Sequence, residues 1–114
     1  MLGTITVTDV LAMWTPDDDG TGDCYTVADT LDYKRQNPDY ADLVEEIRKD
    51  GITVPIFIRT LDGRPWLADG HHRVAAAIDL GIDMLIWTDI PLDVEPHRFN
   101  PMMQRQWGPY RPAA

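Results

Sequence analysis

The spacing of apolar residues predicts two amphipathic helices in the middle of the chain. After Asn37 and Pro38, which can cap and begin a helix, apolar residues recur every three or four positions until Gly51 ends the run: Tyr40, Leu43, Val44 and Ile47. A second helix is predicted over 70–80, ended by Gly81, with an apolar side made of Val74, Ala75, Ala77 and Ile78. Both helices are expected to bury one face and to expose the other.

Runs of β-branched and aromatic residues predict the strands around these helices. The expected strands are TITV at 4–7, VPIFIRT at 54–60, the segment 65–68, and MLIWT at 84–88. Asp62-Gly63 is the expected hairpin turn between the second and third of these, and one turn of helix is expected at 9–13. The mixture predicts an α/β architecture.

The chain of 114 residues is long enough for one domain with one core. We expect that domain at 1–90, with an acidic loop over 15–30 in which Pro, Gly and Asp favour turns. Five prolines follow in the segment 91–114, which predicts a proline-rich arm with room for a short helix at 99–107.

Charge is unevenly distributed in this acidic protein. The net charge is −9, and residues 1–33 hold seven aspartates with no Lys or Arg. Such a chain repels polyanions, so direct binding to DNA is not expected. The absence of a long apolar run or a leader predicts a cytoplasmic protein without a membrane span. Cys24 is the single cysteine, which excludes an internal disulfide and a cysteine-rich zinc site.

Candidate chemistry lies at 66–75, WLADGHHRVA, where a strand ends on an acid and a helix begins. A helix start offers unpaired backbone N–H groups to an anion, and Gly70 would let a ligand approach closely. His71, His72 and Arg73 add side-chain donors over the same turn. The alternative is that Asp69 caps the helix and that the histidines are solvated.

The run from Tyr33 to Ile82 resembles the N-terminal domain of ParB partition proteins and its relatives in the ParB/sulfiredoxin superfamily. The matching features are Gly51, the strand PIFI at 55–58, the Asp62-Gly63 turn and the Gly-x-x-Arg box at 70–73. The resemblance spans residues 2–90 and implies an α+β (mixed α/β) fold built round a small mixed sheet. It also implies that Gly70, His71, His72 and Arg73 contact the phosphates of a nucleotide.

Several positions depart from the family pattern. Partition proteins carry Glu-Arg where this chain has His71-His72, and sulfiredoxins carry a catalytic cysteine at the position of His71. Without a thiol there, sulfinic-acid reduction is not expected. The Asp-Gly-His sequence is similar to that of ADP-dependent free-serine kinases of the same superfamily. Neither a helix-turn-helix nor a dimerisation domain fits after residue 90, so the resemblance implies a stand-alone module.

Asp69 and His72 are the candidate catalytic residues. Beside a phosphate, a carboxylate either holds Mg²⁺ or accepts a proton from an attacking hydroxyl group, which makes Asp69 the candidate metal ligand. Adjacent helical residues diverge by about 100°, which disfavours one transition metal held by both histidines. Further candidates with a solvated or core alternative are Arg59, Lys34 and Arg35 for an anion pocket and Tyr33 and Trp66 for stacking on a base.

These residues lead to two function classes. The first is a nucleotide- or phosphate-binding module that takes a nucleoside di- or triphosphate with Mg²⁺, either as a phosphotransferase or as an NTPase. The second is a non-catalytic interaction protein of a phage or mobile element that binds a host or partner protein, or itself, through its arm. That arm carries the interface-type residues Met102, Met103, Trp107 and Tyr110. A nuclease is a third and weaker possibility, because no second carboxylate cluster accompanies Asp69.

Overall fold

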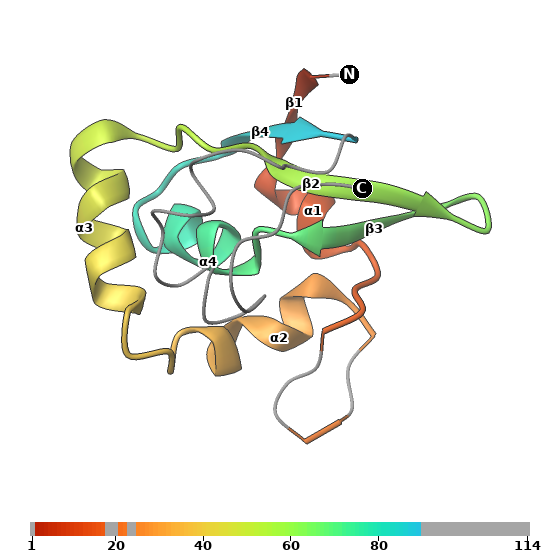
Figure 1. Cartoon of the computed structure of the whole chain (residues 1–114), viewed down its shortest axis with the longest axis horizontal. Coiled ribbons are helices and arrows are strands. Elements are labelled where there is room, and N and C mark those ends of the chain that lie inside the picture. Colours follow the sequence, from red (N-terminus) through yellow and green to blue (C-terminus); the bar gives the residue numbers. More distant parts are fainter. Residues whose placement is uncertain (1, 18–20, 23–24, 90–114) are drawn as a thin grey trace, which may run out of the picture.

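A four-stranded mixed sheet and four helices form the part of the chain that the computed structural model describes, residues 2–17, 21–22 and 25–89. The elements in order are β1 (Leu2–Thr6), α1 (Val7–Leu11), α2 (Val27–Lys34), α3 (Tyr40–Asp50), β2 (Ile56–Leu61), β3 (Arg64–Asp69), α4 (His71–Asp79) and β4 (Met84–Thr88). The predicted α+β fold with a small mixed sheet is therefore confirmed. Figure 1 shows α4 beside the β2–β3 hairpin, α3 along one side of it and α2 below it.

The sheet has the order β1-β4-β2-β3. The β1–β4 and β2–β3 pairs are antiparallel, whereas β2 and β4 run parallel through the pairs Ile56–Trp87 and Phe57–Thr88. Beyond Phe57, β2 continues past the last residue of β4. The β2–β3 register shifts between Phe57 and Ile58, because β3 contains one extra residue, Ala68.

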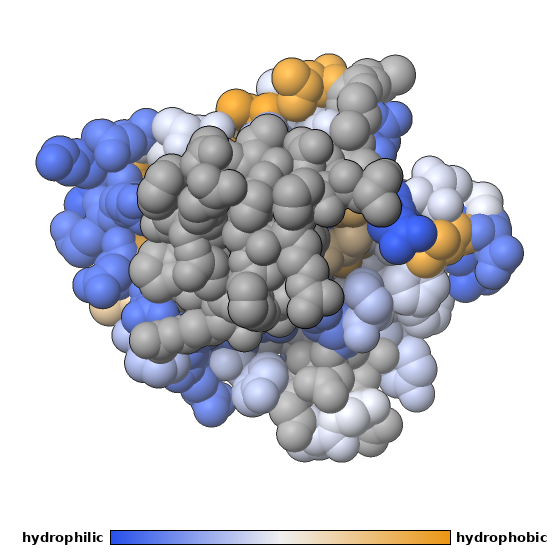
Figure 2. Space-filling model, viewed as in Figure 1, coloured by the Kyte–Doolittle hydropathy of each residue, from blue (hydrophilic) through white to orange (hydrophobic). Residues whose placement is uncertain are grey.

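Helices α1, α2 and α4 and the inner face of the sheet enclose the main core. Val10, Val27 and Val74 from the helices are fully buried with Ile56 and Leu67 from the strands. A smaller cluster of Leu43, Ile47 and Ala76 joins α3 to α4, which places the predicted apolar stripe of α3 against a neighbouring helix. The polar side of α3 is part of the hydrophilic surface in Figure 2. Helix α4 is buried over 71–77 and contacts α1, α2 and α3.

Most predicted elements are confirmed, but α2 was not predicted. Its buried positions are Val27, Thr30, Leu31 and Lys34, which have helical spacing, although two of the four are polar. A polar residue in an apolar slot hides the periodicity on which a sequence-based prediction depends. The capping box of Thr26 and Asp29 was the visible signal of a helix start.

Three local predictions were wrong. Helix α3 begins at Tyr40 with Asp39 as its N-cap, because the Asn37 side chain accepts the Asp39 N–H at 2.9 Å in a turn before the helix. Helix α1 was predicted at 9–13 but spans Val7–Leu11, with Thr6 as its N-cap. Ile78, predicted to be buried, is 38% exposed near the end of α4.

The proline-rich arm and its short helix lie outside the described residues. Within the described residues, no helix is long and apolar enough to span a membrane.

Candidate functional site

The junction between β3 and α4 is built around Gly70. Its φ of +115° is unfavourable for any residue with a side chain, and it is the N-cap of α4, so the predicted capping role of Asp69 is wrong. A Cβ at Gly70 would lie 2.5 Å from Ile56 Cγ2 and 2.9 Å from Ile56 Cβ. The space that we expected to admit a ligand is therefore filled by Ile56 of the adjacent strand. Gly70 is required for close packing of β2 against the helix start.

Asp69 forms an ion pair with Arg73 across the first turn of α4. Arg73 Nη2 donates to Asp69 Oδ2 at 3.1 Å, and Arg73 and Asp69 are only 4% and 2% exposed. Removing either partner would leave a charge buried without compensation. The two charges cancel, so this pair contributes little net attraction for an anionic ligand.

His71 is completely buried and forms contacts through both ring nitrogens. Thr15 Oγ1 lies 2.5 Å from Nε2, and Asp17 Oδ2 lies 3.3 Å from Nδ1 without hydrogen-bond alignment. Thr15 Oγ1 also accepts the Asp17 N–H at 3.0 Å, so we assign its hydroxyl proton to the bond with Nε2 and the imidazole proton to Nδ1. Burial lowers the pKa of His71 to about 4, opposed by the carboxylate of Asp17. The ring is neutral at physiological pH.

Lys34 completes this buried polar cluster. Lys34 is the last residue of α2, and its Nζ lies 2.7 Å from Asp17 Oδ2. Its side chain is 10% exposed. The polar cluster, defined as Thr15, Asp17, Lys34 and His71, thus joins the segment after α1 to the end of α2 and the start of α4. Lys34 was predicted as an anion ligand or a solvated residue, but it is buried and paired with an aspartate.

The structure corrects the alternative in which both histidines are solvated, because His71 and His72 are buried. It also separates Arg35 from the box: Arg35 donates to Asp79 at 3.1 and 3.2 Å, and Tyr40 donates to the same carboxylate. This network joins α2, α3 and α4 on the outside of the helices. Trp66 packs against Trp14 with ring centroids 6.0 Å apart, whereas Tyr33 is 46% exposed.

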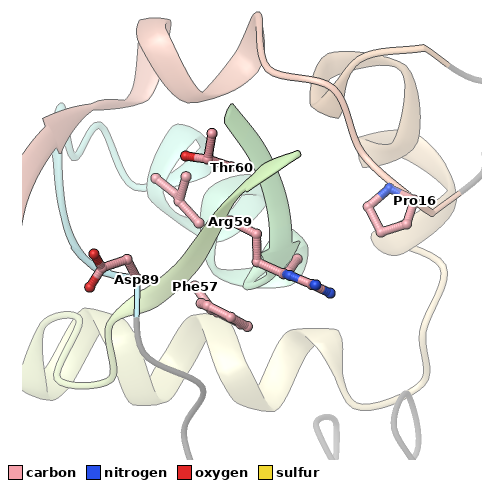
Figure 3. Close-up of a pocket in the computed structure, with 7 residues that line it drawn as sticks. Pro16, Phe57, Arg59, Thr60 and Asp89 are labelled. Atoms are coloured by element: carbon pink, nitrogen blue, oxygen red, sulfur yellow. The ribbon is translucent and has the colours of Figure 1, made fainter. Parts of the chain in front are cut away.

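An open pocket of about 790 Å³ lies over β2, next to the polar cluster. It is lined by Pro16, Phe57, Ile58, Arg59, Thr60, Ala68 and Asp89. In Figure 3, the Arg59 side chain extends from β2 toward Pro16, and Asp89 lies at the other end of the labelled group. Pro16 stands between Thr15 and Asp17, and Ala68 precedes Asp69, so two lining residues are sequence neighbours of the polar cluster and of the Asp69–Arg73 pair.

Arg59 is the candidate anion ligand in this pocket. It is exposed, and it forms no ion pair or hydrogen bond with another residue in the described part of the chain. By contrast, Lys34 and Arg73 are neutralised by Asp17 and Asp69. Of the predicted site residues, the structure therefore brings Asp69, His71 and Arg73 together and places Arg59 on the adjoining pocket.

A protein-built metal centre is not evident at this site. Among residues 2–17, 21–22 and 25–89, no group of three or more His, Cys, Asp or Glu side chains could hold a metal ion. The carboxylate of Asp69 is the partner of Arg73, which competes with the predicted role of Asp69 as a Mg²⁺ ligand. That role, and the catalytic roles of Asp69 and His72, stay predictions.

Thr15 and Asp17 are site residues that the sequence did not indicate. They lie in the segment predicted as an acidic loop, and Thr15 is 56 positions from His71 along the chain. The turn-forming sequence at 14–17 gives no sign of a tertiary partner. The one signal was the presence of a threonine hydroxyl two residues before an aspartate, which is compatible with a local hydroxyl-to-backbone turn.

Comparison with known proteins identifies the fold. No protein-family model matches the chain, and no curated protein matches it. The crystal structure of sulfiredoxin from Arabidopsis thaliana is similar over 77% of this chain and 82% of that chain, with 22% sequence identity and a TM-score of 0.50. A conserved hypothetical protein from Pyrococcus furiosus is similar over 76% of this chain and 31% of that chain, with 18% identity and a TM-score of 0.46. The likeness to sulfiredoxin shows a sulfiredoxin-like fold.

Proposed function

We propose that this sulfiredoxin-like module binds a small phosphate-bearing molecule, of the nucleoside phosphate class, in the pocket over β2. The observation that carries the proposal is Arg59, a guanidinium on the pocket wall without an acidic partner in the described residues. A guanidinium can hold a phosphate with two parallel hydrogen bonds. Pockets of roughly 300–1,000 Å³ are typical of small-molecule sites, and this one has about 790 Å³.

The other lining residues suit the uncharged part of such a ligand. Phe57, Ile58, Pro16 and Ala68 provide apolar surface, and the Thr60 hydroxyl can donate or accept a hydrogen bond. Apolar walls with a few polar groups are the usual composition of a cofactor pocket. A nucleoside phosphate combines a flat, weakly polar base with an anionic end, and the wall offers a surface for each.

Charge balance favours Arg59 over the buried residues as the first phosphate contact. A phosphate at Lys34 or Arg73 would have to displace Asp17 or Asp69 from distances of 2.7 and 3.1 Å. Breaking the buried pair of Asp69 and Arg73 costs several kcal/mol, whereas Arg59 has no ion pair to break among the described residues.

We propose Mg²⁺ as a companion of the ligand. Mg²⁺ keeps several waters and is commonly held by substrate phosphates together with one or two carboxylates, so it does not need a ready-made protein cage. The same proposal includes turnover of the bound nucleotide, as in a phosphotransferase or an NTPase. Release or transfer of phosphate measures it.

Calorimetric titration with ATP, ADP, CTP and GTP, each with and without Mg²⁺, tests the proposal. Arg59→Gln should weaken the binding of the best ligand about tenfold, the effect of losing one charge-assisted contact worth roughly 1.4 kcal/mol. Arg48→Gln is the matched control, because Arg48 pairs with Glu45 on the surface of α3. The proposal fails if no nucleotide binds the wild-type protein, or if both variants bind as the wild type does.

A further inference from the structure

Strand β1 is an edge strand with the composition of an interface. In the described part of the chain, it bonds to β4 on one side and forms one end of the sheet, and its sequence LGTIT has neither a charged residue nor a proline. Edge strands that remain solvated usually carry lysine, proline or a bulge, because a bare edge pairs readily with another strand. The β1–β4 register is continuous over five pairs, so the edge is also free of bulges.

The hydrogen-bond pattern shows which residues point outward. Val7 N–H donates to Asp83 O at 2.8 Å, one step beyond the Thr6–Met84 pair. Because the bonding direction alternates along an antiparallel strand, Ile5 and Gly3 also direct their backbone groups toward β4. Leu2, Thr4 and Thr6 therefore direct theirs away from the sheet.

The surface beside this edge is apolar and uncharged. Leu2, Met84 and Ile86 are 68%, 48% and 37% exposed, and their strand positions place them on one face of the sheet. Thr4 and Thr6 lie between them on that face. Figure 2 shows hydrophobic surface at the top of the molecule, where Figure 1 places β1 and β4.

We propose that two copies of this chain associate through β1, edge to edge and antiparallel, and extend the sheet across a two-fold axis. A second copy fits this edge because β1 has no charged residue, so no like charges of the two strands meet across the axis. The edge is also self-complementary: with Thr4 on the axis, Leu2 faces the partner's Thr6. This register gives about six hydrogen bonds from three closely spaced residue pairs.

Sedimentation equilibrium of the full chain over a range of concentrations tests this inference. The wild type should approach 25.8 kDa, twice the monomer mass of 12.9 kDa, as its concentration rises to about 100 µM. Thr4→Pro should weaken the dimer at least about tenfold, because it removes an outward N–H and leaves the β1–β4 hydrogen bonds in place. Thr4→Val is the matched control, since it keeps that N–H and should remain dimeric.

Thr4→Lys is the second variant in case proline unfolds the strand. It keeps the backbone but places a charge at the edge, and it should also weaken the dimer at least about tenfold. Circular dichroism and thermal melting verify that each variant is folded. A wild type that stays monomeric at the highest concentration overturns the proposal, and so does a folded Thr4→Pro or Thr4→Lys protein that dimerises as tightly as the wild type.

Discussion

Protonation of His71 should destabilise the fold in mildly acidic solution. The imidazole is fully buried, and burial, together with Lys34, His72 and Arg73, lowers its pKa to about 4, from an ordinary value of 6.5. The unfolded chain therefore binds a proton between pH 6.5 and 4 that the folded chain does not bind. Stability contributed by neutral His71 is complete above pH 6.5 and is lost as the pH falls toward 4.

The magnitude follows from the width of that window. Each pH unit within it costs about 1.4 kcal/mol of the free energy of unfolding, so the full loss is about 3 kcal/mol. A domain of this size is stable by roughly 5–15 kcal/mol, so the effect is measurable. The 19 Asp and Glu residues also titrate on acidification, and their contribution must be subtracted.

Urea unfolding of the wild type and of His71→Gln at pH 7.5, 6.5, 5.5 and 4.5 separates the two contributions. Gln can keep a hydrogen bond to Thr15 through its terminal amide but cannot be protonated in this range. We expect His71→Gln to be less stable than the wild type at pH 7.5 and to lose less stability on acidification, so that the two curves converge. Curves that fall in parallel would refute the assignment of a buried, neutral imidazole.

Two substitutions probe the packing around the site by urea unfolding. Gly70→Ala should lower the free energy of unfolding by about 2–4 kcal/mol, because it combines a positive φ with a Cβ placed 2.5 Å from Ile56 Cγ2. Gly63→Ala is the control: at φ +75° with open space around it, it should cost only about 1 kcal/mol. Equal losses would mean that the Ile56 side chain moves aside. Tyr40→Phe should cost about 1 kcal/mol by removing the hydrogen bond to Asp79 that joins α3 to α4, and an unchanged stability would show that this bond is solvated.

Local sequence patterns were sufficient for much of the fold. Strand β4 has its predicted bounds, Met84–Thr88, and the Asp62-Gly63 turn has the positive φ values, +52° and +75°, that a two-residue hairpin requires. These features depend on neighbouring residues, which a sequence shows directly. Helix α2 was missed because two polar residues, Thr30 and Lys34, occupy core-facing positions. Thr30 donates to the Val27 carbonyl within the helix, and Lys34 pairs with Asp17 from a distant segment.

The residues at the β3–α4 junction form contacts that their order in the sequence only partly indicates. The pair of Asp69 and Arg73 has the four-residue spacing of a helical ion pair and could have been predicted. The partners of His71 could not, because Thr15 and Asp17 come from a segment that is remote in sequence. The role of Gly70 also depends on a distant residue, since Ile56 occupies the space that the glycine leaves.

The buried polar cluster links the stability of the domain to the shape of the proposed pocket. Pro16 lines the pocket, and its two neighbours in sequence are held by the cluster: Thr15 by His71, and Asp17 by Lys34. A proline between two fixed residues has little remaining backbone freedom. Changes at His71 or Lys34 should therefore move one wall of the pocket without removing any ligand contact, whereas a change at Arg59 removes a contact and leaves the wall in place. Comparing ligand affinity with the free energy of unfolding for both kinds of variant separates binding residues from those that position the wall.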